Sequence, residues 1–158
     1  MARQLIKGMT MLLLVVALAF VTAVASAYGQ STKASAEIPF DFTVGSKSLA
    51  AGHYYLSNVG PSREILKIMA AQAPTTVMST TVKIGGGAPA QKGKLVFHRY
   101  GNRYFLAEIW TSGESQGQKL FKSREEKALE RELASITSKS ELAQRGYERV
   151  EVALATGN

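Results

Sequence analysis

The stretch KLVFHRYGNRYFLAEIWT, residues Lys94 to Thr111, decides the fold that we predict for this chain. Its centre, Gly101-Asn102, is a two-residue turn typical of a β-hairpin, in which glycine supplies the backbone freedom that the first position needs. On one face this turn pairs Tyr100 with Arg103, His98 with Phe105, and Val96 with Ala107. On the other face it pairs Arg99 with Tyr104, Phe97 with Leu106, and Leu95 with Glu108.

Both faces of this hairpin carry large apolar side chains. A hairpin with one face in solvent has a single apolar face, because alternate residues of a strand point to opposite sides. We therefore expect the second face to be covered as well, by a helix, by another strand or by a ligand.

Further strands precede and follow the hairpin. From Ala36 the chain alternates with period two, so that Ile38, Phe40, Phe42 and Val44 face one way, as in a half-buried strand. Leu49 follows a Gly45-Ser46 turn and can pack back on Phe42. Apolar or β-branched runs predict further strands over 53–59, 64–69, 75–84 and 147–154, with loops over 85–93 and 112–118.

One amphipathic helix is predicted near the C-terminus, over 124–136. Ser123 stands at the cap and Glu126 three residues later, which is a capping box. A narrow apolar stripe follows at helical spacing, and we expect it to pack on the sheet or to close an open barrel end. The stripe consists of Ala128, Leu129, Leu133 and Ile136.

Together these elements predict a single, mainly β domain over 36–154. We expect an antiparallel curved sheet or small barrel of about six to eight strands, with the one C-terminal amphipathic helix. The chain has no cysteine. Disulfides, thiolate metal sites, a catalytic cysteine and a lipid-anchor cysteine are therefore excluded, and the fold must rely on packing and strand pairing.

The first 27 residues have the pattern of a signal peptide. Arg3 and Lys7 precede an apolar run from Met11 to Val21, and Ala25-Ser26-Ala27 supplies small residues for cleavage after Ala27. The alternative is an uncleaved membrane anchor, because the run from Met9 to Ala27 is close to the length that spans a bilayer. Residues 28–35 are predicted to be a flexible leader. We expect a protein exported to the periplasm or the extracellular space, with no transmembrane helix after cleavage.

The charge of the chain favours anionic partners. The formal net charge is +7, and it becomes +5 without Arg3 and Lys7. A basic exported domain attracts acidic polysaccharide or lipid headgroups at long range, whereas nucleic acid is not expected as a partner. The alternative interpretation is ordinary solubilising charge.

Aromatic and basic side chains alternate in the hairpin, and they are the candidate ligand-binding residues. A hairpin tip carrying them could stack on a sugar or hold an anionic group. The alternative is cross-strand pairing that stabilises the hairpin. The candidates are His98, Tyr100, Arg103, Tyr104 and Trp110.

Signals of catalysis are weak. The two histidines, His53 and His98, stand in no metal-ligand spacing, so we expect no metal site and no cofactor. No G-x-S-x-G nucleophile motif is present. A hydrolase would have to combine His98 or His53 with a nearby carboxylate, and Asp41 and Glu108 are a possible pair of acid and base.

The chain also resembles a group of small, exported, uncharacterised bacterial β-rich proteins with the pattern I-P-F-x-F, L-P-A-G-x-Y, F-x-R-Y-G and K-S-x-x-E. The matching stretches begin at Ile38, Leu49, Phe97 and Lys122, and Ala50 replaces the proline of the second motif. The resemblance covers roughly residues 36 to 136. It implies an established domain type, but no activity is known for the group, so no functional role transfers.

We therefore predict an exported, non-catalytic binding or interaction module of the bacterial envelope. Its ligand would be a small amphipathic molecule in an open barrel mouth, or an anionic glycan or lipid surface. The alternatives are an envelope hydrolase using His98 or His53, and a small outer-membrane β-barrel, for which most of the predicted strands are short. The sequence leaves the oligomeric state open.

Overall fold

A computed structural model describes residues 34–60, 62–136 and 147–156. It is mainly β, with ten strands in one sheet and the helix α2 (Arg124–Ile136). The strands are β1 (Ala34–Ile38), β2 (Phe42–Val44), β3 (Lys47–Leu49), β4 (Gly52–Val59), β5 (Ile65–Ala70), β6 (Thr76–Gly85), β7 (Gly93–Tyr100), β8 (Arg103–Trp110), β9 (Gln116–Leu120) and β10 (Glu148–Thr156).

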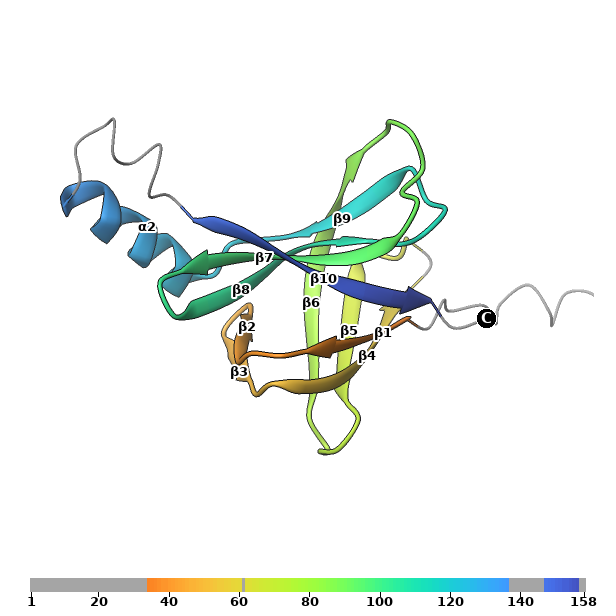
Figure 1. Cartoon of the computed structure of the whole chain (residues 1–158), viewed down its shortest axis with the longest axis horizontal. Coiled ribbons are helices and arrows are strands. Elements are labelled where there is room, and N and C mark those ends of the chain that lie inside the picture. Colours follow the sequence, from red (N-terminus) through yellow and green to blue (C-terminus); the bar gives the residue numbers. More distant parts are fainter. Residues whose placement is uncertain (1–33, 61, 137–146, 157–158) are drawn as a thin grey trace, which may run out of the picture. The chain divides into compact units, whose positions relative to one another are not determined.

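Eight of the strands close into an antiparallel barrel. Their order is β8-β7-β10-β1-β4-β5-β6-β9, and β9 pairs with β8 again to complete the ring (Figure 1). This confirms the predicted mainly β, antiparallel fold with one C-terminal helix, and of the two forms left open, a curved sheet or a small barrel, it is the barrel. Closure leaves no free sheet edge in the ring, which matters in a chain without disulfides.

The central hairpin β7–β8 has the predicted turn but only half of the predicted register. The pairs from Tyr100–Arg103 to Phe97–Leu106 are as expected. A bulge then leaves Ala107 without a partner, so that Val96 faces Glu108 and Leu95 faces Ile109. The predicted pairs Val96–Ala107 and Leu95–Glu108 were wrong for a physical reason: the extra residue keeps Ile109 in the core and turns Glu108 outward.

The N-terminal strand is shorter and starts earlier than predicted. Ala34 and Ser35 belong to β1, so the leader does not extend to residue 35. The chain leaves the strand after Ile38 because Pro39 has no N–H to donate. β2 then forms a short hairpin with β3, in which Phe42 faces Leu49 as expected, and pairs parallel with β8 outside the ring.

Strand β9 was missed, because residues 112–118 were predicted to be a loop. The sequence of β9, QGQKL, has low β-propensity. It forms a strand because β6 and β8 both offer it hydrogen-bonding partners: Ile84 pairs with Gly117, and Glu108 pairs with Lys119. This strand closes the barrel.

The interior of the barrel is apolar. The side chains that point inward from all eight ring strands form one buried cluster, which the β2–β3 hairpin extends. Its largest fully buried members include Phe97, Ile38, Ile68 and Leu95. The core therefore follows the period-two alternation of the sequence.

Helix α2 lies beside the turn end of β7 and β8 (Figure 1). The Ser123 Oγ accepts a hydrogen bond from the Glu126 N–H at 3.0 Å, which confirms the predicted cap. The residue that α2 buries is Glu126, at 4% exposure, whereas Ala128 is exposed and Leu129 and Leu133 are only half-buried. Polar contacts therefore dock the start of the helix, and the predicted stripe is only half-buried at Leu129 and Leu133.

The predicted signal peptide, residues 1–27, and most of the predicted leader lie outside the described residues. The last strand, β10, ends at Thr156, two residues beyond the predicted domain end. Within the segments that the structure describes, no helix is both long and apolar enough to cross a membrane.

Candidate functional site

The five candidate side chains do not gather at one place. His98, Tyr100 and Arg103 lie at the turn end of β7–β8 beside α2, whereas Trp110 lies at the opposite end of β8. The structure therefore divides the candidates into three that contact the helix, Tyr104, which packs on Phe40, and a single tryptophan on another part of the surface.

Trp110 lies flat on strand β9. A Cβ built on Gly117 would lie 2.7, 2.8 and 2.9 Å from Cδ2, Cε2 and Cε3 of the indole. Three nearly equal distances place Gly117 under the face of the ring rather than at its edge. The far end of the indole reaches Gly85 of β6, where a Cβ would meet Cη2 at 3.0 Å. Only glycine at these positions lets an indole lie so close to the backbone.

The indole lines a surface groove of ≈ 470 Å³. One wall is the β6–β7 loop, and the other is the outward face of β7 and β10. The loop is held in place, because Ala90 N–H donates to Glu114 O at 3.0 Å and Gly113 N–H donates to Ala90 O at 2.8 Å. The lining residues are Ala88, Ala90, Gln91, Lys92, Lys94, Trp110, Arg149 and Glu151.

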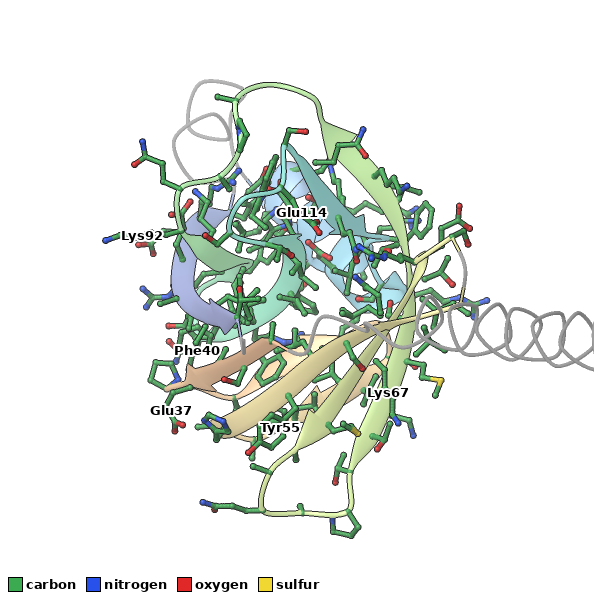
Figure 2. All side chains as sticks on the ribbon, turned by 90° about the vertical axis from the view of Figure 1, so that its right-hand side faces the viewer. Glu37, Phe40, Tyr55, Lys67, Lys92 and Glu114 are labelled. Atoms are coloured by element: carbon green, nitrogen blue, oxygen red, sulfur yellow. The ribbon has the colours of Figure 1, made fainter. Side chains whose placement is uncertain are left out.

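The rim of this groove is rich in cations. Lys94 Nζ donates to Glu151 Oε1 at 2.8 Å, and this hydrogen bond from Lys94 is the main reason that the pKa of Glu151 lies below its usual value. Lys92 lies exposed on the loop wall (Figure 2). Lys92, Lys94 and Arg149 therefore outnumber the one acidic lining residue, Glu151.

Buried Glu108 positions the groove from beneath. Its Oε2 accepts hydrogen bonds from Trp110 Nε1 at 2.9 Å and from Arg149 Nη2 at 3.0 Å. The bulge at Ala107 turns Glu108 outward to make these contacts. Sequence reasoning considered Glu108 only as a catalytic carboxylate, and it missed Arg149 and the two glycines as site residues, since their roles depend on the bulge and on β9.

The second set of candidates forms a buried polar network with α2. The His98 Nδ1 lies 2.7 Å from Glu126 Oε1, and both side chains are 5% exposed. Tyr100 Oη donates to Glu130 Oε1 at 2.8 Å. Burial and that hydrogen bond raise the pKa of Tyr100 above its usual value. The ring of Tyr147 packs on His98 with centroids 3.8 Å apart.

Glu130 completes this network through Lys122. Burial alone would raise the pKa of Glu130, but hydrogen bonds from Lys122 and Tyr100 lower it below the usual value. The helix is thus attached by carboxylates to the outward face of β7. We expected the second face of the β7–β8 hairpin to be covered. At the turn end of the hairpin, α2 covers that face.

Arg103 and Tyr104 make local contacts. Arg103 pairs with Glu125 of α2, and its guanidinium lies 5.5 Å from the centroid of Phe105. Tyr104 stacks on Phe40 with centroids 3.8 Å apart, and Arg99 lies over the ring. Cross-strand and helix contacts account for both residues, and their role in ligand binding stays a prediction.

The two histidines each meet a carboxylate, and neither of these is Asp41 or Glu108, which we considered as a pair of acid and base. His53 Nδ1 lies 3.1 Å from Glu37 Oε2 on the exposed face of β1 and β4. Asp41 instead accepts a hydrogen bond from the Ala51 N–H, and Glu108 belongs to the groove. Among the described residues, no cluster of His, Asp and Glu could hold a metal ion.

A second hollow, of ≈ 360 Å³, lies where the β8–β9 turn meets β6 and the β4–β5 turn. Its wall is polar and includes Arg63, Lys83, Glu114, Gln116 and Gln118. Arg63 Nη1 lies 3.6 Å from Glu114 Oε1. A polar hollow of this kind offers little apolar contact to the small amphipathic ligand that we considered for a barrel mouth.

The groove lined by Trp110 therefore has the side chains of a binding site. The contacts between α2 and β7 are those of a structural attachment. In comparisons with known proteins, no family model, no curated protein and no solved structure matches this chain.

Proposed function

We propose that this protein is an exported, non-catalytic binding module of the bacterial envelope that takes an acidic saccharide in the Trp110 groove. The observation that carries the proposal is the indole itself. It is seated flat on Gly117 and Gly85 and lines a groove whose rim carries three cations.

An aromatic ring with one face packed on backbone is a rigid platform. Trp110 cannot turn inward, because Gly117 lies beneath it, and its N–H is already bonded to Glu108. A ligand that stacks on it therefore loses little affinity to ordering the side chain. The apolar face of a sugar ring suits such a platform, while hydroxyl groups can bond to polar groups at the edge.

The charges of the rim favour an acidic sugar over a neutral one. Lys92, Lys94 and Arg149 are at the rim, and Lys94 and Arg149 are held in place by glutamates. Cations at an exposed rim act mainly on the association rate and the salt dependence of binding. We expect binding to weaken as salt is raised.

The test uses the one tryptophan of the chain, Trp110, as the reporter. The protein is titrated with polygalacturonate and, as a neutral control, with dextran, while the Trp110 emission is recorded. We expect a change with polygalacturonate only. Lys92→Ala should weaken binding by about three- to fivefold, or about 0.6–1 kcal/mol. Lys127→Ala, an exposed helix lysine outside the groove, should leave it unchanged.

Calorimetry with Trp110→Phe completes the test. This variant keeps an aromatic ring but shortens the platform, and we expect it to lose most of the heat of binding. If polygalacturonate gives neither heat nor an emission change, or if Trp110→Phe binds it as wild type does, the groove is not a saccharide site.

The second candidate is a hydrolase, and the buried His98–Glu126 pair is the observation that favours it. A carboxylate on Nδ1 is the arrangement that orients a catalytic histidine. However, no hydroxyl group of the described residues is hydrogen-bonded to His98. Release of p-nitrophenol from p-nitrophenyl acetate that is lost in His98→Gln, with the fold intact by circular dichroism, would favour the enzyme.

A further inference from the structure

The large apolar side chains that remain exposed are concentrated on one face of the barrel. In the described part of the chain, seven of them are exposed, and six lie on or next to β4, β5 and β6. The seventh, Tyr147, packs beside His98. We call the six the β4–β6 patch: Tyr55, Val59, Ile65, Met78, Val82 and Phe121, which are between 38% and 61% exposed.

The strand register makes this patch continuous. Val59 pairs with Ile65, and Ile65 pairs with Thr80 on the next strand. Phe121 lies one residue beyond the Leu120–Thr81 pair, so it continues the same row past Thr80. Half-buried Met69 pairs with Tyr55. An exposed apolar surface that crosses several strands is unusual for a soluble domain and marks an interaction site.

The charge of the patch narrows the class of partner. Alternation with the core residues Leu56, Leu66 and Val77 identifies the side chains that point outward from β4, β5 and β6. Among them Lys67, which faces Met78 across the strands, is the only Lys, Arg, Asp or Glu. On β9, Lys119 pairs with Val82. The patch therefore combines apolar side chains with lysines. The carboxylate at its Tyr55 end, Glu37, is paired with His53, whose ring packs on Tyr55.

We propose that the β4–β6 patch docks this domain on the surface of an anionic lipid bilayer. Phe121, Met78 and Val82 would enter the boundary between headgroups and acyl chains. The stems of Lys67 and Lys119 would lie along the apolar surface while their ammonium groups reach lipid phosphates. Tyr55, labelled with Lys67 in Figure 2, suits the same depth, because tyrosine favours the membrane interface.

A second copy of the chain fits the patch less well. A two-fold pairing through the centre of the patch would bring Lys67 close to Lys67 of the other copy, and like charges at a dry interface are costly. A barrel that spans the bilayer also fits less well. Such barrels are apolar all round and polar inside, whereas this core is apolar and the outward face of β7 and β10 carries Lys94, Arg149 and Glu151.

The test exploits the absence of cysteine from the chain. A cysteine is introduced as Met78→Cys in the full chain and labelled with the fluorophore NBD. The control is Ala153→Cys, at an exposed position on β10 away from the patch. Both proteins are mixed with vesicles of phosphatidylcholine and phosphatidylglycerol (about 7:3), with and without a spin-labelled lipid quencher.

We expect the label at residue 78 to shift to the blue and to be quenched by spin-labelled lipid, and the label at 153 to do neither. Phe121→Ser should reduce the fraction of the residue-78 label that enters lipid by about tenfold. Lys67→Gln with Lys119→Gln should reduce the preference for anionic over neutral vesicles, whereas Lys127→Gln should not.

Several results would overturn the proposal. The label at residue 78 could stay aqueous while the protein sediments with vesicles, which would assign lipid contact to another part of the chain. Equal quenching at residues 78 and 153 would mean that the patch has no special role. A dimer in sedimentation, with the residue-78 label already blue-shifted without lipid, would make the patch an interface between copies. None of these outcomes bears on the Trp110 groove.

Discussion

A Gly117→Ala variant would place a methyl group where the indole of Trp110 now lies. The new Cβ would meet three ring atoms at 2.7, 2.8 and 2.9 Å, whereas carbon atoms in contact lie about 3.5 Å apart. The ring must therefore lift by roughly 0.7 Å. Overpacking of a filled site costs about 1–3 kcal/mol. Because the groove side of the ring is open, we expect the lower half of that range.

Lifting the ring also strains its hydrogen bond to Glu108, which is 2.9 Å long. Losing that bond would cost about 1 kcal/mol. We therefore predict that Gly117→Ala lowers the free energy of unfolding by about 1–3 kcal/mol and weakens saccharide binding at the same time. The groove and the stability of the barrel are coupled because Gly117, which lies under the Trp110 indole, belongs to β9, the strand that closes the barrel.

Urea unfolding followed by the emission of Trp110 measures both effects, because this is the one tryptophan of the chain. The matched control is Gly87→Ala. A Cβ on Gly87 would meet nothing within 4 Å, so its stability should stay within about 0.5 kcal/mol of wild type. The native emission of Gly117→Ala should differ from wild type, and that of Gly87→Ala should not.

A double-variant cycle shows whether Gly117→Ala destabilises the protein through a clash with the indole or with the backbone. In a Trp110→Leu background, followed by circular dichroism, Gly117→Ala should cost less than about 0.5 kcal/mol. If the alanine destabilises the Trp110→Leu protein as much as it destabilises wild type, the clash is with the backbone of β9 rather than with the ring. If Gly117→Ala matches wild type in both stability and emission, the platform geometry is wrong.

Two further predictions concern the attachment of α2. Glu126→Gln removes the charge beside His98 and should cost about 1–3 kcal/mol, with faster amide exchange in residues 124–135, whereas exposed Glu132→Gln should change neither. Because the pKa of Tyr100 is raised in the folded protein, its contribution is complete below its ordinary value of 10.0 and is lost as the pH rises above it. Because the pKa of Tyr54 is raised as well, a pH titration of unfolding should show a larger loss in wild type than in Tyr100→Phe, and an identical profile in both would remove Tyr100 as the cause.

Local patterns were sufficient to predict most of the barrel. Strands β4, β5, β6 and β10 begin and end within two residues of the predicted ranges, because their apolar side chains alternate and glycine or proline bounds them. The bounds of α2 agree with the prediction, since Ser123 and Glu126 form a local cap. These features depend on neighbours in sequence, and the sequence contains them in full.

The candidate site could be predicted only in part, because it depends on tertiary pairing. Trp110 was a candidate from its residue type, but its platform needs Gly117, and no local signal identifies QGQKL as a strand. Similarly, Glu108 reaches Trp110 and Arg149 only because Ala107 bulges. The bulge forms because it places apolar Ile109 opposite Leu95 in the core. Without it Glu108 would lie there, and burying its carboxylate without a partner would be costly.

A strand with apolar side chains on both faces needs both faces covered, and this holds for β5 and β6 as well as for the β7–β8 hairpin. On β7 the outward side chains His98 and Tyr100 are buried, and α2 supplies the cover through Glu126 and Glu130. The outward side chains of β5 and β6 are as apolar, yet Ile65 and Met78 stay 41% and 60% exposed. Polar side chains at these positions would cost nothing in packing, because the face is exposed, so the apolar groups there are not explained by the stability of the barrel. The rule therefore predicts a cover that comes from outside the described chain, and the lysines within the patch favour an anionic bilayer as that cover.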